Sequence, residues 1–150
     1  MATAVSTNKA QALLEIEQAF GRVPHWIEIM PEGVFLGFWT QMRDFYFAET
    51  AIPVKYKELI GLAVSGATRC KYCALFHTEG ARLAGATDEE IAEASAMGAL
   101  SMEGSTFLNA MQIDYDEFKK ETLEIVRFVR EQQAKKAAAA PKQGQREQRA

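Results

Sequence analysis

The apolar residues of this chain recur at the three- and four-residue spacing of an amphipathic helix, and no convincing segment shows the strict alternation of a strand. A first helix carries Ile16 and Phe20 on its apolar face, with Thr7 or Asn8 as the capping residue and Gly21 as its end. The segment VPHWIEIMPEG holds two prolines and predicts a loop or a short helical turn. The pattern therefore predicts an all-α fold.

An aromatic stripe follows at helical spacing. Its members are Phe35, Phe38, Trp39, Met42, Phe45 and Tyr46. We interpret the stripe first as core, and as the wall of a pocket or a subunit interface in the second place, because aromatic residues are enriched in both.

A central antiparallel helix pair is predicted from the middle of the chain. Pro53 suits the first position of a helix. The segment LIGLAVSGAT after Glu58 has ten residues and no charge, so we expect this helix to be buried on most sides. Residues 70–84 form the next helix, which ends where Gly85 favours a left-handed backbone.

Two more helices follow. Thr87 and Glu90 have the spacing of a capping box, and residues 91–99 present small side chains that permit close helix packing. The last helix is expected to begin near Asp114 or Asp116. Its predicted buried residues are Phe118, Ile125 and Val129. These segments add up to a bundle of about six to seven helices.

Length and charge suggest one domain over residues 1–131 and a basic tail, frayed or disordered, over 132–150. The net charge of −3 hides an asymmetry, since residues 1–131 carry −7. An acidic body argues against a nucleic-acid partner.

No stretch has the roughly 18 apolar residues of a membrane span or the pattern of a secretory signal. We therefore expect a cytoplasmic protein with no membrane partner, in a compartment that keeps thiols reduced.

The candidate chemistry lies in TRCKYCALFHTEG, which holds both cysteines of the chain and one of its two histidines. Cys70 and Cys73 are three residues apart, and His77 follows four residues later, so all three share one helix face. Cys70 falls in the predicted first turn, where the positive end of the helix dipole stabilises a thiolate.

Glu58 is predicted to lie beside His77. If the two central helices are antiparallel, both residues are roughly 14–15 Å from the turn that joins them. A carboxylate next to imidazole orients the ring and raises its basicity. We infer a proton relay from Glu58 through His77 to Cys73, with Cys70 as the disulfide partner.

Other interpretations stay open at this point. Glu58 could pair with a nearby basic residue, and the two thiols could be inert small hydrophobes. A zinc site has three candidate ligands in Cys70, Cys73 and His77, with only His25 or Glu58 as a fourth. We expect no metal and no cofactor.

The run from Glu58 through eleven residues to CKYCALFH resembles the signature of the alkylhydroperoxidase D-like branch of the carboxymuconolactone decarboxylase family. GATDEEIAEA is similar to the next helix of that family, and the resemblance covers roughly residues 35–112. It implies an all-α fold in homo-trimers or homo-hexamers. It also implies thiol-dependent peroxidase or disulfide-reductase chemistry, in which the glutamate, both cysteines and the final histidine form a proton relay.

One departure from the family concerns Tyr72, which stands where peroxidase members carry a histidine before the second cysteine. Tyrosine can donate a hydrogen bond but is a poor base at neutral pH, so we assign Tyr72 a supporting role. The predicted substrates are a peroxide or a disulfide, with an external dithiol as reductant. A non-enzymatic scaffold and a decarboxylase-type enzyme, with His77 or His25 as its base, are the alternatives.

Overall fold

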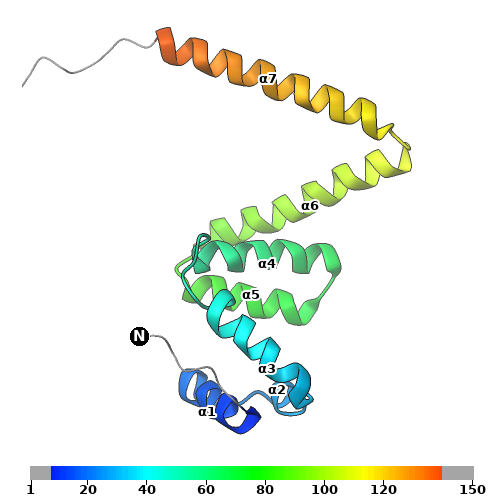
Figure 1. The fold of residues 1–150 in the computed structure, drawn as a ribbon. Helices are drawn as coiled ribbons and strands as arrows, with labels where there is room; N and C mark the ends of the chain where they lie inside the picture. The colour runs from blue at the N-terminus through cyan, green and yellow to red at the C-terminus, as the bar shows by residue number, and fades with distance from the viewer. Residues whose placement is uncertain (1–7, 140–150) are drawn as a thin grey trace, which may run out of the picture. The chain divides into compact units, whose positions relative to one another are not determined.

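A computed structural model describes residues 8–139 (Figure 1). The described part of the chain forms seven α-helices and one π-helical turn. Their bounds are α1 (Lys9–Phe20), α2 (His25–Glu28), α3 (Glu32–Gln41), η1 (Met42–Tyr46), α4 (Val54–Thr68), α5 (Lys71–Leu83), α6 (Asp88–Ala110) and α7 (Tyr115–Ala139). None of the described helices is long and apolar enough to cross a membrane. The all-helical fold predicted from the sequence is confirmed.

The chain separates into two compact units, which meet within α6 between Met102 and Glu103. The structure continues α7 to Ala139, so the predicted tail is helical over residues 132–139. The lysine- and alanine-rich sequence there has a high helix propensity, which accounts for this extension of the helix. The rest of the predicted tail lies outside the described residues. A single domain over residues 1–131 stays a prediction.

The amino-terminal helices pack around a small core. Asn8 caps α1 through its side-chain oxygen, which accepts from the Gln11 amide at 2.9 Å, and Gly21 ends the helix with a φ of 74°. Both features confirm the predicted helix ends. The core residues are Ala12, Ile16, Ile27, Phe35 and Trp39. Two members of the aromatic stripe are thus core residues, as predicted, whereas Phe45 is 62% exposed.

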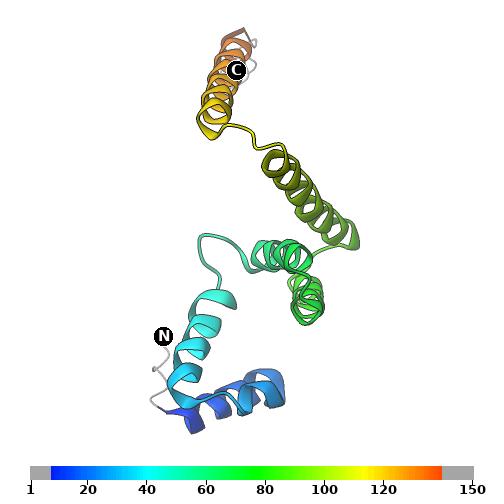
Figure 2. The same cartoon turned by 90° about the vertical axis from the view of Figure 1, so that its right-hand side faces the viewer.

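Helices α4 and α5 form the predicted central antiparallel pair and lie side by side in two perpendicular views (Figures 1 and 2). Pro53 is the N-cap of α4, so the helix begins at Val54, one residue later than predicted. Gly85 has the expected left-handed backbone, with a φ of 83°. The pair is the frame that holds the candidate site.

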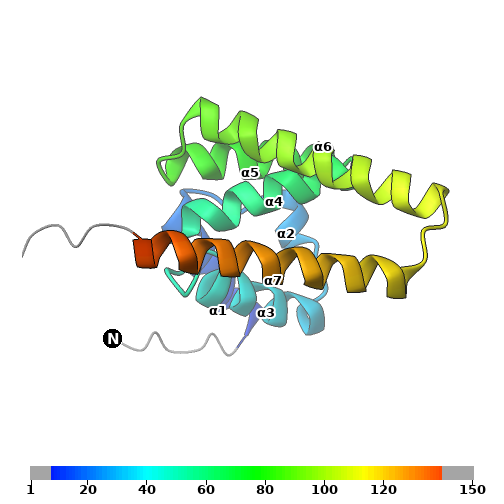
Figure 3. The same cartoon turned by 90° about the horizontal axis from the view of Figure 1, so that it is seen from above.

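The first half of α6 runs along α4 (Figure 3). Thr87 and Glu90 form the predicted capping box, in which each side chain accepts from the other residue's amide, at 3.1 and 2.9 Å. Gly98 approaches the Ala63 backbone so closely that a β-carbon there would lie 2.8 Å from the Ala63 carbonyl oxygen. The predicted small-residue seam is therefore used for helix packing.

Two predictions of burial are wrong for the single chain. Ile60 and Val64 of α4 are about half exposed, because α5 and α6 leave part of the helix surface uncovered. Phe118, Ile125 and Val129 are also exposed. Within the second unit, α7 has no buried residue among those whose burial is described, so the rest of that unit does not cover its apolar face.

Candidate redox-active site

The two cysteines lie at the junction of α4 and α5. Arg69 ends α4 in a left-handed conformation with a φ of 57°, and Cys70 is the N-cap of α5. The sequence pattern places Cys70 in the first turn of this helix. In the structure Cys70 lies just before that turn, because the sharp reversal between the two helices requires extended backbone there. Its sulfur accepts from the Cys73 amide at 3.3 Å.

Cys70 and Cys73 are joined in a disulfide, with their α-carbons 5.3 Å apart. That separation lies within the ordinary range for disulfides. The helix N-terminus supplies a partial positive charge at Cys70. The pair is thus positioned both to form a disulfide and to stabilise a thiolate when the bond is open.

Glu58 and His77 face each other across the helix pair. The Glu58 side chain is almost fully buried, and its Oε2 lies 2.9 Å from Nδ1 of His77, whose side chain is 18% exposed. The antiparallel spacing of α4 and α5 therefore brings these two residues together, as the sequence led us to expect. Within the described residues, the hydrogen-bond contacts of the His77 ring are made by Nδ1. The catalytic role of His77 stays a prediction.

Tyr46 is a third member of this group, and the sequence did not identify it. Its hydroxyl donates a short hydrogen bond to Glu58 Oε2 and lies 2.9 Å from His77 Nδ1. The Tyr46 ring also packs edge-on against the His77 ring, with centroids 5.8 Å apart. Burial, reinforced by the neighbouring Glu58, raises the pKa of Tyr46 well above its usual value. The phenol therefore stays protonated and acts as a donor.

A π-helical turn and a buried lysine position Tyr46. The turn η1 ends at Tyr46, and π-helical insertions are frequent at functional sites. Lys57 of α4 is buried and donates to the backbone carbonyls of Phe45 and Ala48, at 2.5 and 2.7 Å. Because Lys57 precedes Glu58, the same helix holds both the carboxylate and the turn that carries the phenol.

Two glycines make the close approach of the side chains possible. A β-carbon at Gly61 of α4 would lie 2.5 Å from His77 Nδ1, and one at Gly80 of α5 would lie 2.5 Å from the Glu58 carboxyl carbon. Each glycine comes three residues after the polar residue of its own helix and makes room for the polar residue of the other. Any larger side chain at either position would displace a member of the site.

Two other predicted residues lie outside this hydrogen-bonded group. Tyr72 is 77% exposed, with the Lys71 ammonium 5.2 Å from its ring centroid, and its supporting role stays a prediction. His25 is exposed on α2, where it lies 3.8 Å from Glu28. Among residues 8–139, no three His, Cys, Asp or Glu side chains are arranged to hold a metal ion.

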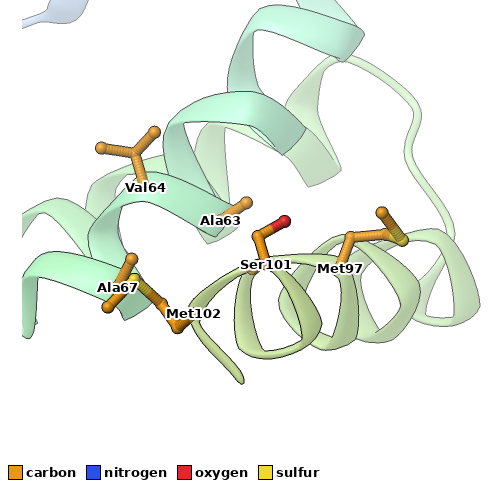
Figure 4. A pocket seen from close by; sticks show the side chains of 7 residues that line it. Ala63, Val64, Ala67, Met97, Ser101 and Met102 are labelled. Carbon is orange, nitrogen blue, oxygen red and sulfur yellow. The ribbon is translucent and has the colours of Figure 1, made fainter. Parts of the chain in front are cut away.

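A groove of about 250 Å³ lies between α4 and residues 97–102 of α6 (Figure 4). Its lining is apolar apart from one hydroxyl, with residues Ala63, Val64, Ala67, Met97, Gly98, Ser101 and Met102. None of the cysteines, Tyr46, Glu58 or His77 lines it. The groove is thus separate from the candidate chemistry.

Comparisons with known proteins agree on the helical architecture. The family model for carboxymuconolactone decarboxylases matches residues 34–114. The alkylhydroperoxidase AhpD core of Rhodospirillum rubrum is 27% identical with a TM-score of 0.61, and the match covers 78% of this chain and 96% of that one. A protein from Methanobacterium thermoautotrophicum is 32% identical with a TM-score of 0.50, over 59% of this chain and 98% of its own. The predicted alkylhydroperoxidase D-like fold is confirmed.

A curated relative from Paracoccus denitrificans bears the name "uncharacterized protein 4 in cox locus". It is 39% identical over 64 residues, which make up 43% of this chain. The match spans 58% of that relative's length. Its name does not specify a reaction.

Proposed function

Because the chain belongs to the carboxymuconolactone decarboxylase family, we propose that it is a thiol-dependent oxidoreductase that reduces hydroperoxides or disulfides. The observation that carries the proposal is the Cys70–Cys73 disulfide at the start of α5, the helix on which His77 meets the buried Glu58. A dithiol, a base and a residue that orients the base are the parts that nucleophilic thiol chemistry needs.

In the proposed reaction, the reduced protein begins the cycle with two thiols. His77 takes the proton of Cys73, and the thiolate attacks one oxygen of the peroxide. A sulfur–oxygen bond forms and the oxygen–oxygen bond breaks, while the proton from His77 passes to the departing alcohol or water. Cys73 becomes a sulfenic acid, and Cys70 displaces water from it to form the disulfide. An external dithiol then restores both thiols by supplying two electrons and two protons.

Cys73 is the proposed attacking residue because it stands one helical turn before His77. The position of Cys70 at the helix N-terminus favours the opposite order. Trapping the sulfenic acid in single variants decides between them. We expect Cys70→Ser to accumulate the trapped adduct on Cys73 and Cys73→Ser to accumulate none. An adduct formed only when Cys70 is retained contradicts the assignment.

Peroxide turnover tests the function itself. The reduced protein should consume peroxide catalytically in the presence of a small dithiol, and Cys70→Ser/Cys73→Ser should have no turnover above background. Lactone decarboxylation that survives in the double variant would instead support the decarboxylase alternative. Thiols that neither react with peroxide nor exchange with disulfides would support a scaffold.

A homo-trimer or homo-hexamer is proposed as the working form. The support is the exposed apolar side chains of α7, among them Phe118, Ile125, Phe128 and Val129, which exceed what a monomeric surface needs. Light scattering coupled to gel filtration should give three or six times the 16.7 kDa of the chain. We expect Ile125→Glu to shift the distribution towards the monomer, whereas Tyr56→Phe should not. A wild-type monomer at micromolar concentration contradicts the proposal.

A further inference from the structure

Tyr46, Glu58 and His77 form a closed triangle of polar atoms. The Tyr46 hydroxyl and His77 Nδ1 both contact the same carboxylate oxygen, Oε2 of Glu58, and they lie 2.9 Å from each other. Glu58 is only 3% exposed, so both contacts are shielded from bulk water. The positions of the protons in this triangle follow from the number of donors available.

The phenol has one proton, and its short contact directs that proton to Glu58 Oε2. It therefore cannot donate to His77. A lone pair on Nδ1 would then face two oxygens at 2.9 Å and be repelled by both, so Nδ1 must carry a proton. In the neutral ring the lone pair is then on Nε2, the nitrogen that can accept a proton from a substrate or a thiol.

We propose that Tyr46 is a positioning residue: its hydroxyl gives the buried Glu58 carboxylate a second donor and fixes His77 as the Nδ1–H tautomer, with Nε2 as the proton acceptor. Its catalytic consequence rests on the proposed function, whereas the proton arrangement does not. Within the site, Tyr46 donates to Glu58 in much the same way as His77 does. The two donors thus divide the charge of one carboxylate between them.

The surroundings of Tyr46 fit this role. Its ring packs against the rings of Phe76 and His77, with centroids 6.0 and 5.8 Å away, and these contacts restrict how far the hydroxyl can turn from the carboxylate. Lys57 also fixes the end of η1, because its ammonium group donates to the Phe45 carbonyl. The raised pKa of Tyr46 keeps its proton in place across the physiological range.

Nitrogen NMR of the histidine rings tests the proposal on the full-length protein. His25→Gln leaves His77 as the single ring signal of the chain and so assigns it. We expect the neutral ring to carry its proton on Nδ1. A neutral ring protonated on Nε2 overturns the proposal without the need for any variant at Tyr46.

Tyr46→Phe tests the effect of the hydroxyl. With one donor lost, the Glu58 carboxylate accepts from His77 alone, so the hydrogen bond from Nδ1–H should strengthen and the Nδ1 proton resonance should move downfield. Tyr56→Phe is the matched control, because the described contact of Tyr56 is with Lys55, outside the triangle, and it should leave that resonance unchanged. An unchanged Nδ1 proton resonance in a folded Tyr46→Phe protein would show that the phenol only fills space.

Turnover separates this proposal from the function. If the thiols cycle, Tyr46→Phe should lower peroxide turnover by about tenfold, because Glu58 and the His77 ring lose a contact that holds them in place, while the disulfide still forms on oxidation. Full turnover in Tyr46→Phe contradicts the positioning role. Thiols that fail to cycle in the wild-type protein overturn the proposed function alone, because the ring signals still report the proton arrangement.

Discussion

His77→Gln is expected to slow peroxide turnover by about 10²- to 10⁴-fold, the usual contribution of a positioned general base. Glutamine keeps a polar side chain of similar length but cannot accept the thiol proton at neutral pH. The measurement is steady-state peroxide consumption with a dithiol reductant in excess.

His25→Gln provides the matched control, because this second histidine is exposed on α2 and its described contact is with Glu28. We expect it to retain wild-type turnover. Equal loss in both variants, or no loss in His77→Gln, contradicts the assignment of His77 as the base. Disulfide formation under a strong oxidant should survive in His77→Gln, which shows that the cysteines themselves remain competent.

Alanine at Gly80 or Gly61 is expected to damage both stability and turnover. The new β-carbon would collide with the Glu58 carboxyl group or the His77 ring, and such overpacking costs about 1–3 kcal/mol of the free energy of unfolding. This outweighs the gain of about 0.5–1 kcal/mol that alanine gives inside a helix. Urea denaturation measures the stability, and peroxide consumption measures the damage to the site.

Gly66→Ala separates the collision from the helix propensity. Gly66 lies in the same helix as Gly61, but no atom lies within 4 Å of a β-carbon built there. The Gly66→Ala protein should therefore be slightly more stable than the wild type and keep full turnover. If Gly80→Ala and Gly61→Ala have the same stability and peroxide turnover as Gly66→Ala, the close packing around Tyr46, Glu58 and His77 does not contribute to function.

The pairing of Glu58 with His77 could be anticipated because both residues lie in regular helices joined by a sharp turn. The rise per residue of a helix is fixed, so equal distances from the turn place two residues side by side. The spacing of Cys70, Cys73 and His77 placed them on one helix face for the same reason. These parts of the site depend on local geometry that the sequence encodes directly.

Tyr46 could not be found in this way. It ends a π-helical turn, where helical spacing no longer predicts direction, and residues 47–53 separate it from α4 without a regular element. A polar hydroxyl at the end of an otherwise apolar stripe was the available signal. Gly61 and Gly80 offered another, since each follows a polar site residue by three positions.

The burial of Ile60, Val64 and the apolar face of α7 was overestimated because an apolar stripe indicates that a surface is covered but does not identify the partner. A helix neighbour in the same chain and a second copy leave the same pattern in the sequence. The exposed faces are therefore where assembly is expected to act.

A redox titration of Cys70 and Cys73 in dithiol buffers, followed by alkylation and intact mass, shows whether the two cysteines form a redox couple. We expect a single two-electron transition between two thiols and the intramolecular disulfide. The midpoint potential of this transition would rank the reductants that can serve the protein. A difference of about 30 mV between two dithiol couples corresponds to about 1.4 kcal/mol. If both thiols stay free across the whole range of buffers, or pair only between chains, the cysteines are not a redox couple and the proposed oxidoreductase function is wrong.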